Sequence, residues 1–113
     1  MTQNRNKLID LFIGNISNSV VHKILEKAID DRDIWQRYEK ESITSWKIAK
    51  KYREKINPVY SSLPEKDIRY IKTKVINKVE SELTLRISKG YENISLDLIE
   101  ELVDKILKEI NIT

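Results

Sequence analysis

The chain has 113 residues, of which 40% are hydrophobic, 21 are basic and 18 are acidic, so its formal net charge at neutral pH is +3. This length and hydrophobic content predict a single helical domain over residues 1–113 with a core of its own. The absence of cysteine excludes disulfides, thiolate zinc sites and thiol nucleophiles.

The pattern of apolar residues predicts helices throughout. Two glycines and two prolines leave few positions for tight turns, and apolar residues recur at spacings of three and four along most of the chain. We therefore expect an all-α fold, a compact bundle of about five helices joined by short loops. The first helix is expected over about residues 4–13, with Gly14 ending it in a left-handed conformation.

The second and third helices follow from their capping residues. Ser17 or Asn18 can cap a second helix, whose apolar residues from Val20 to Ile29 fill about half of the circumference. Asp33, with a glutamine three residues later, fits a capping box at the start of a long central helix over about residues 34–56. The Ser-Ile-Thr-Ser segment at residues 42–45 has low helix propensity and could break this helix in two.

Two further helices complete the chain. A second capping box starts at Ser62 and predicts a fourth helix that begins at Leu63 and ends near Lys89-Gly90. Ser95 can cap the last helix, which carries apolar residues on one half of its circumference and mostly acidic residues on the other.

No segment is suited to a membrane. The longest apolar run near the amino terminus, residues 8–13, contains Asp10 and falls far short of the roughly 18 to 20 residues that span a bilayer. The run is also too short and too polar for a signal peptide. The sequence thus predicts a cytoplasmic protein with no membrane partner.

The sequence contains no recognisable catalytic motif. His22 is the only histidine, and it has no partner at triad or metal-ligand spacing, so we expect it to be structural. Two glycines cannot build a phosphate-binding loop. Helix capping and a solvated helix surface explain the acidic clusters at residues 30–33 and 100–104 better than a metal does. We therefore expect no enzymatic activity, no cofactor and no metal.

Positive charge is concentrated in the middle of the chain. Residues 47–78 contain ten basic and three acidic residues, residues 1–46 contain seven of each, and residues 79–113 contain four basic and eight acidic residues. A positive middle and a negative tail either attract an external anion or pair with another part of the same molecule. On the fourth helix, Lys72 and Arg86 lie close to the apolar stripe. Their long stems can cover apolar surface while the charged ends reach water, or they can pair with acids of the last helix, within the chain or from a second copy.

Basic residues of the central helix fall on one side of it: Arg37, Lys40, Lys47, Lys51 and Lys55. At about 100° per residue they lie within about 80° of one another, and the step from Arg37 to Lys55 extends about 27 Å. We call these five residues the basic ridge. A row of cations of this length can follow a phosphate backbone, so they are candidate nucleic-acid-binding residues. Glu41 and Glu54 flank the ridge, as acids do on an ordinary solvated helix surface.

The aromatic residues of the middle region fall mostly on the other side of that helix: Trp35, Tyr38, Trp46 and Tyr52. Core packing is therefore favoured over base stacking as their role. Tyr60 and Tyr70 are the exceptions, because one lies in a loop and the other lies off the apolar stripe of its helix.

Two hypotheses for function remain. The first is a small non-enzymatic interaction module, self-associating or an accessory subunit of a larger assembly, because the second and last helices present broader apolar halves than one helix contact requires. The second is sequence-independent, salt-sensitive binding of DNA or RNA by the basic ridge. Acids of the last helix beside the ridge would favour internal or intersubunit ion pairs, whereas an open ridge would favour an external anion.

Overall fold

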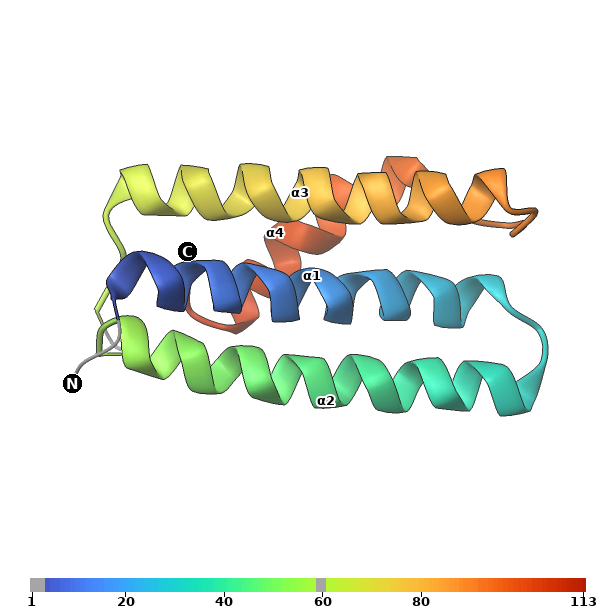
Figure 1. Ribbon diagram of the computed structural model, residues 1–113, viewed down its shortest axis with the longest axis horizontal. Coiled ribbons are helices and arrows are strands. Elements are labelled where there is room, and N and C mark those ends of the chain that lie inside the picture. Colours follow the sequence, from blue (N-terminus) through green and yellow to red (C-terminus); the bar gives the residue numbers. More distant parts are fainter. Residues whose placement is uncertain (1–3, 59–60) are drawn as a thin grey trace.

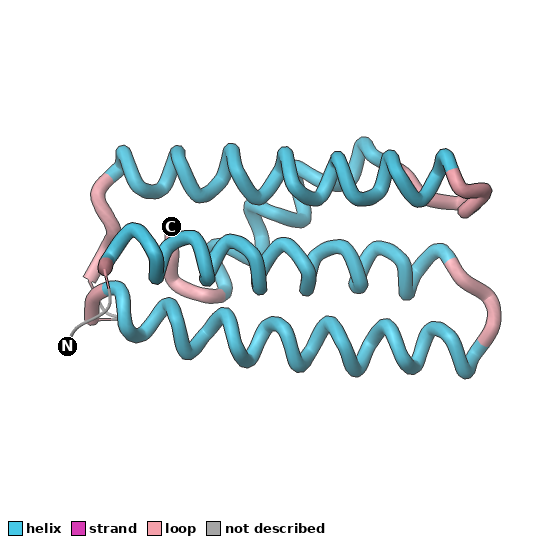
Figure 2. The backbone as a smooth tube through the Cα atoms, in the orientation of Figure 1, coloured by secondary structure: helices cyan, strands magenta, loops and turns pink. Residues whose placement is uncertain are grey.

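The computed structural model describes residues 4–58 and 61–113, and this part of the chain forms an all-helical bundle, which confirms the predicted fold class. Its elements are α1 (Arg5–Ala28), α2 (Arg32–Ile56), α3 (Glu65–Ser88), the short 3₁₀ helix η1 (Leu96–Leu98) and α4 (Ile99–Glu109). The three long helices lie side by side with α1 between α2 and α3, and α4 crosses behind α1 and α3 (Figure 1). The loops between the long helices lie at the two ends of the bundle (Figure 2).

The first two predicted helices are one continuous helix, α1. The predicted stop at Gly14 and the predicted cap at Ser17 or Asn18 are therefore wrong. A glycine inside a helix costs about 1 kcal/mol relative to alanine. Burial of Ile13 and Ile16 on either side of the glycine outweighs that cost, since each fully buried side chain contributes about 1.5 to 3 kcal/mol. The spatially central helix is thus α1, and α2 lies at the edge of the bundle.

Helix starts also differ from the predicted ones. Asp31 caps α2, and its side chain accepts hydrogen bonds from the backbone N–H groups of Asp33, at 3.0 Å, and of the residue after it. The predicted cap at Asp33 is therefore two residues too late. α3 begins at Glu65 without a side-chain cap, so the predicted capping box from Ser62 does not form. Ser95 precedes η1, and its side chain makes no capping hydrogen bond either.

The predicted weak point at residues 42–45 does not break α2. Ser42 and Ser45 are buried against α1, where their hydroxyl groups hydrogen-bond with Ser19 and Asn18 respectively. The small serine side chains allow the two helices to approach closely. Contacts between helices therefore override the low helix propensity of this segment.

Buried hydrophobic residues in the described part of the chain form one cluster, supplied mainly by α1, α3 and α4. α2 contributes only Ala49 and Ile56 to the fully buried set, and polar residues complete its buried face. α2 is thus a peripheral helix, which leaves its outer side free to meet other molecules. Within residues 4–58 and 61–113, no helix combines the length and the apolar character that crossing a membrane requires.

Candidate nucleic-acid interface

The basic ridge lies on the side of α2 opposite to the buried residues of that helix. All five of its residues are exposed: Arg37, Lys40, Lys47, Lys51 and Lys55. The buried residues of α2 fall on the other side of the helix: Ser42, Ser45, Ala49, Arg53 and Ile56. Because α2 is straight and continuous over this span, the ridge is a single row about 27 Å long.

The acids of α4 lie beside α3 rather than beside the ridge. Lys72 of α3 pairs with Asp104 at 2.9 Å and with Glu100 at 3.7 Å. The hydrogen bond to Asp104 holds the pKa of Lys72 above its ordinary value. Among the described residues, no salt bridge joins a ridge side chain to a carboxylate. The ridge is therefore open to solvent and unopposed by the acidic helix.

A shallow hollow between α1 and α2 adjoins the amino-terminal half of the ridge, and Arg37, Lys40, Glu41 and His22 contribute to its lining. His22 has partners for both ring nitrogens. Its Nδ1 lies 2.8 Å from the backbone oxygen of Asn18, and its Nε2 lies 2.8 Å from the Glu41 carboxylate. The first contact lies within α1, and the second joins α1 to α2. In the part of the chain that the structure describes, no group of three histidine or acidic side chains could hold a metal ion.

Three of the four aromatic residues of α2 pack against the core, whereas Trp35 is half-buried outside that cluster. Tyr38, Trp46 and Tyr52 are half-buried against the core. The ammonium group of Lys50 lies 5.5 Å from the ring centre of Trp46, and that of Lys55 lies 5.7 Å from the ring centre of Tyr52. Contacts of this kind stabilise a helix surface by cation–π attraction. The aromatic rings therefore support α2, and the ridge itself carries no row of rings for base stacking.

Tyr70, one of the two aromatic exceptions, is exposed on α3. Its hydroxyl group donates a hydrogen bond to Asp10 of α1 at 3.2 Å, and this bond to a carboxylate raises the pKa of Tyr70. Tyr70 therefore links α3 to α1 outside the ridge. Tyr60, the other exception, lies outside the described residues.

A polar cluster that sequence reasoning missed connects α2 with the end of α3. Arg86 donates hydrogen bonds to Glu82 at 3.3 Å and to the hydroxyl group of Tyr91 at 3.4 Å. Burial raises the pKa of Tyr38, and its hydroxyl group in turn holds the pKa of Tyr91 below its ordinary value. Arg86 therefore pairs with an acid of its own helix at i,i+4 spacing and not with the acids of the last helix, which the sequence offered as partners. Only Tyr38 comes from a distant segment, so its part in the cluster could not have been predicted from a local pattern.

The buried position of Arg53 is a second feature that the sequence did not predict. Its side chain is only 1% exposed and donates hydrogen bonds to oxygens of Asn57, Ser61 and Asn111. Burial lowers the pKa of its guanidinium group. Arg53 thus ties together the end of α2, the following loop and the carboxyl-terminal segment. The only local signal is the i,i+4 spacing to Asn57 at the end of the helix.

The fold and the candidate site define a small all-helical protein in which α2, one of the two outer long helices, presents an open basic ridge. No protein-family model, curated protein or solved structure matches the chain.

Proposed function

We propose that the protein binds the phosphate backbone of nucleic acid through the basic ridge of α2. One observation carries this proposal: the five ridge side chains are exposed and unpaired with acids among the described residues, while Glu100 and Asp104 of the acidic helix engage Lys72. An exposed row of like charges concentrates positive potential along one edge of the molecule. A polyanion with evenly spaced phosphates is the partner that this row fits best.

Counterion release is the expected source of the binding energy. Duplex DNA carries about one charge per 1.7 Å of helix axis, so a ridge of about 27 Å can meet several phosphates. Arg37 can bind a phosphate through two N–H groups, whereas each lysine acts as a point charge. Without base-reading loops or stacking rings along the ridge, binding should be independent of sequence. It should also weaken steeply as salt is added.

Charge reversal on the ridge tests the proposal. Replacing Lys47, Lys51 and Lys55 together with glutamate should abolish binding to DNA and RNA at low salt. The matched control reverses three exposed lysines of α3, namely Lys66, Lys74 and Lys78, and so changes the net charge by the same amount. The control should retain most of the binding. Equal losses in both triple variants, or no measurable binding by the wild type at low salt, would refute the ridge as a binding surface.

A second candidate function is a non-enzymatic interaction module, self-associating or part of a larger assembly. The broad apolar halves that suggested it are largely used inside the fold, since Val20, Val21 and Leu25 of α1 and Val103 and Leu107 of α4 are buried. One apolar groove between α1 and α4 stays open, and the exposed side chain of Leu98 contributes to its lining. This groove is the observation that favours the second candidate.

A further inference from the structure

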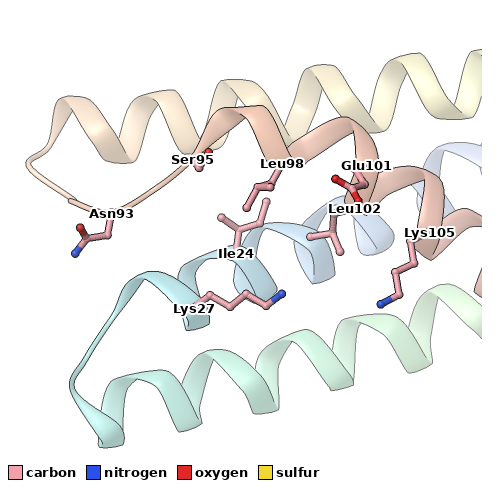
Figure 3. A pocket seen from close by; sticks show the side chains of 8 residues that line it. All are labelled: Ile24, Lys27, Asn93, Ser95, Leu98, Glu101, Leu102 and Lys105. Carbon is pink, nitrogen blue, oxygen red and sulfur yellow. The ribbon is translucent and has the colours of Figure 1, made fainter.

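The groove lies on the face of the bundle that α4 crosses, on the other side of α1 from the hollow beside His22, and it encloses about 250 Å³. Ile24 of α1 and Leu98 and Leu102, at the start of the carboxyl-terminal helical segment, supply its apolar lining (Figure 3). This volume is below the range of about 300 to 1,000 Å³ that is typical of small-molecule sites. It is instead suited to one or two apolar side chains of a protein.

Leu98 is the most exposed large hydrophobic residue of the described chain, at 51%, and Leu96 in the same 3₁₀ helix is 37% exposed. The residues that follow in α4 behave differently, since Ile99, Val103 and Ile106 are all buried. The apolar half of the carboxyl-terminal segment is therefore covered by the bundle except at η1 and, in part, at Leu102. Burying a leucine side chain fully contributes about 1.5 to 3 kcal/mol, so this end of the segment favours a covering partner.

Charged groups border the apolar lining on two sides. In Figure 3 the ammonium ends of Lys27 and Lys105 lie on the side of the groove nearer α2, and the carboxylate of Glu101 lies on the opposite side, level with Leu98. None of these three side chains forms a salt bridge within the described part of the molecule. The surface thus has a positive edge, an apolar centre and a negative edge.

We propose that a second copy of the chain covers this groove in a two-fold symmetric dimer. A symmetric interface pairs one patch with itself, so the patch must contain both charge signs and a self-compatible apolar centre. A two-fold axis running along the apolar strip lays the positive edge of each copy over the negative edge of the other. The partner's Leu98 then packs against Ile24 and Leu102, and the partner's Glu101 faces Lys27 and Lys105. This inference rests on the second of the two proposed functions and names the partner.

Sedimentation velocity on the full chain, at increasing protein concentration, measures the dimer directly. The Leu98→Asp variant should raise the dimer dissociation constant by more than about tenfold, because it places a charge in the apolar centre. Leu85→Asp, on the exposed surface of α3, is the matched control and should leave the dissociation constant unchanged. Circular dichroism and thermal unfolding show whether each variant keeps its fold.

Two charge variants give a sharper test. The double variant Lys27→Glu with Lys105→Glu has two negative edges, and Glu101→Lys has two positive edges. Each variant alone should be monomeric at concentrations where the wild type is dimeric, because like charges then face each other. An equal mixture of the two should form a heterodimer, because both edges are then complementary. This rescue would not occur if the substitutions had only damaged the fold.

Each result decides the proposal. Weakened dimers in the separate variants, together with a heterodimer in the mixture, support it. A wild type that stays monomeric overturns it and leaves a different protein as the occupant of the groove. A wild type that dimerises with no response to these substitutions also overturns it, but preserves the broader function as a self-associating module. Phosphate binding by α2 is measured separately on the same variants, so its failure is distinguishable from either outcome.

Discussion

Ser19 of α1 and Ser42 of α2 hydrogen-bond to each other's backbone. The hydroxyl group of Ser19 donates to the carbonyl oxygen of Ser42 at 2.8 Å, and the hydroxyl group of Ser42 donates to the carbonyl oxygen of Ser19 at 2.8 Å. Both residues are buried, and their hydroxyl oxygens are 3.1 Å apart. This reciprocal pair helps to fix the register of α1 against α2.

Removing the serine pair should destabilise the protein in a coupled way. Ser19→Ala and Ser42→Ala should each lower the free energy of unfolding by about 1 kcal/mol, since each removes a buried hydrogen bond and weakens the other. The double variant should lose less than the sum of the two, because the two hydroxyl oxygens also lie 3.1 Å apart and each substitution removes that contact. Urea unfolding measures all three values. Ser81→Ala, at an exposed position of α3, is the control and should change stability little. Strict additivity would contradict an interaction between the two hydroxyl groups.

The two glycines should respond in opposite ways to alanine. Gly14 lies inside α1, is exposed, and has open space where a Cβ atom would be added. Gly14→Ala should therefore stabilise the protein by about 0.5 to 1 kcal/mol. Gly90 has a φ angle of +99°, where an L residue is strained, so Gly90→Ala should destabilise it. Thermal unfolding of both variants checks the two predictions. A fall in stability for Gly14→Ala would contradict the continuous helix.

Periodicity in the sequence was enough to predict the fold class, but not the helix boundaries. Apolar spacing reports which residues can share a face, and it does so whether or not a glycine or a serine interrupts the pattern. Gly14 continues α1 because isoleucines on both sides of it are buried, and Ser42 continues α2 because another serine faces it from α1. Such contacts between distant segments are not visible in a local pattern, so local propensity gave the wrong boundary.

The candidate site shows the same limit. Helical geometry alone grouped the five ridge residues, because their angular positions depend only on sequence separation. It could not reveal that Lys72 engages the acids of α4, nor that Arg53 leaves the surface altogether. Both facts depend on how helices far apart in sequence pack together. A charge count over residues 47–78 therefore overstated the positive surface, because it included the buried Arg53 and the paired Lys72.

Arg53 should be more important for stability than any lysine of the same helix. Arg53→Lys keeps the charge but loses the planar set of donors that reaches Asn57, Ser61 and Asn111 at once. Buried acceptors left without partners cost about 1 to 3 kcal/mol, so the variant should lose stability in that range. Amide hydrogen exchange should also rise at Ile112, whose side chain is buried beside this contact segment. Arg69→Lys, at an exposed position of α3, should change neither measurement.

The salt dependence of nucleic-acid binding should report how many ridge residues contact phosphates. If all five ridge residues neutralise phosphates of a duplex, the logarithm of the binding constant should fall against the logarithm of salt concentration with a slope of about −4.5. Neutralising one residue, as in Lys51→Gln, should make the slope less steep by about one unit. The change should be the same on duplexes of unrelated sequence, because phosphate contacts carry no base information.

A matched variant separates the ridge from net charge. Lys78→Gln removes one exposed charge from α3 and alters the total charge by the same amount as Lys51→Gln. Lys78 lies outside the row that follows the backbone, so its loss should lower affinity slightly through the long-range field and leave the slope nearly unchanged. Fluorescence anisotropy titrations at several salt concentrations give both quantities. If Lys51→Gln and Lys78→Gln change the slope equally, the nucleic acid is bound by diffuse charge, and the ridge of α2 has no special part in binding.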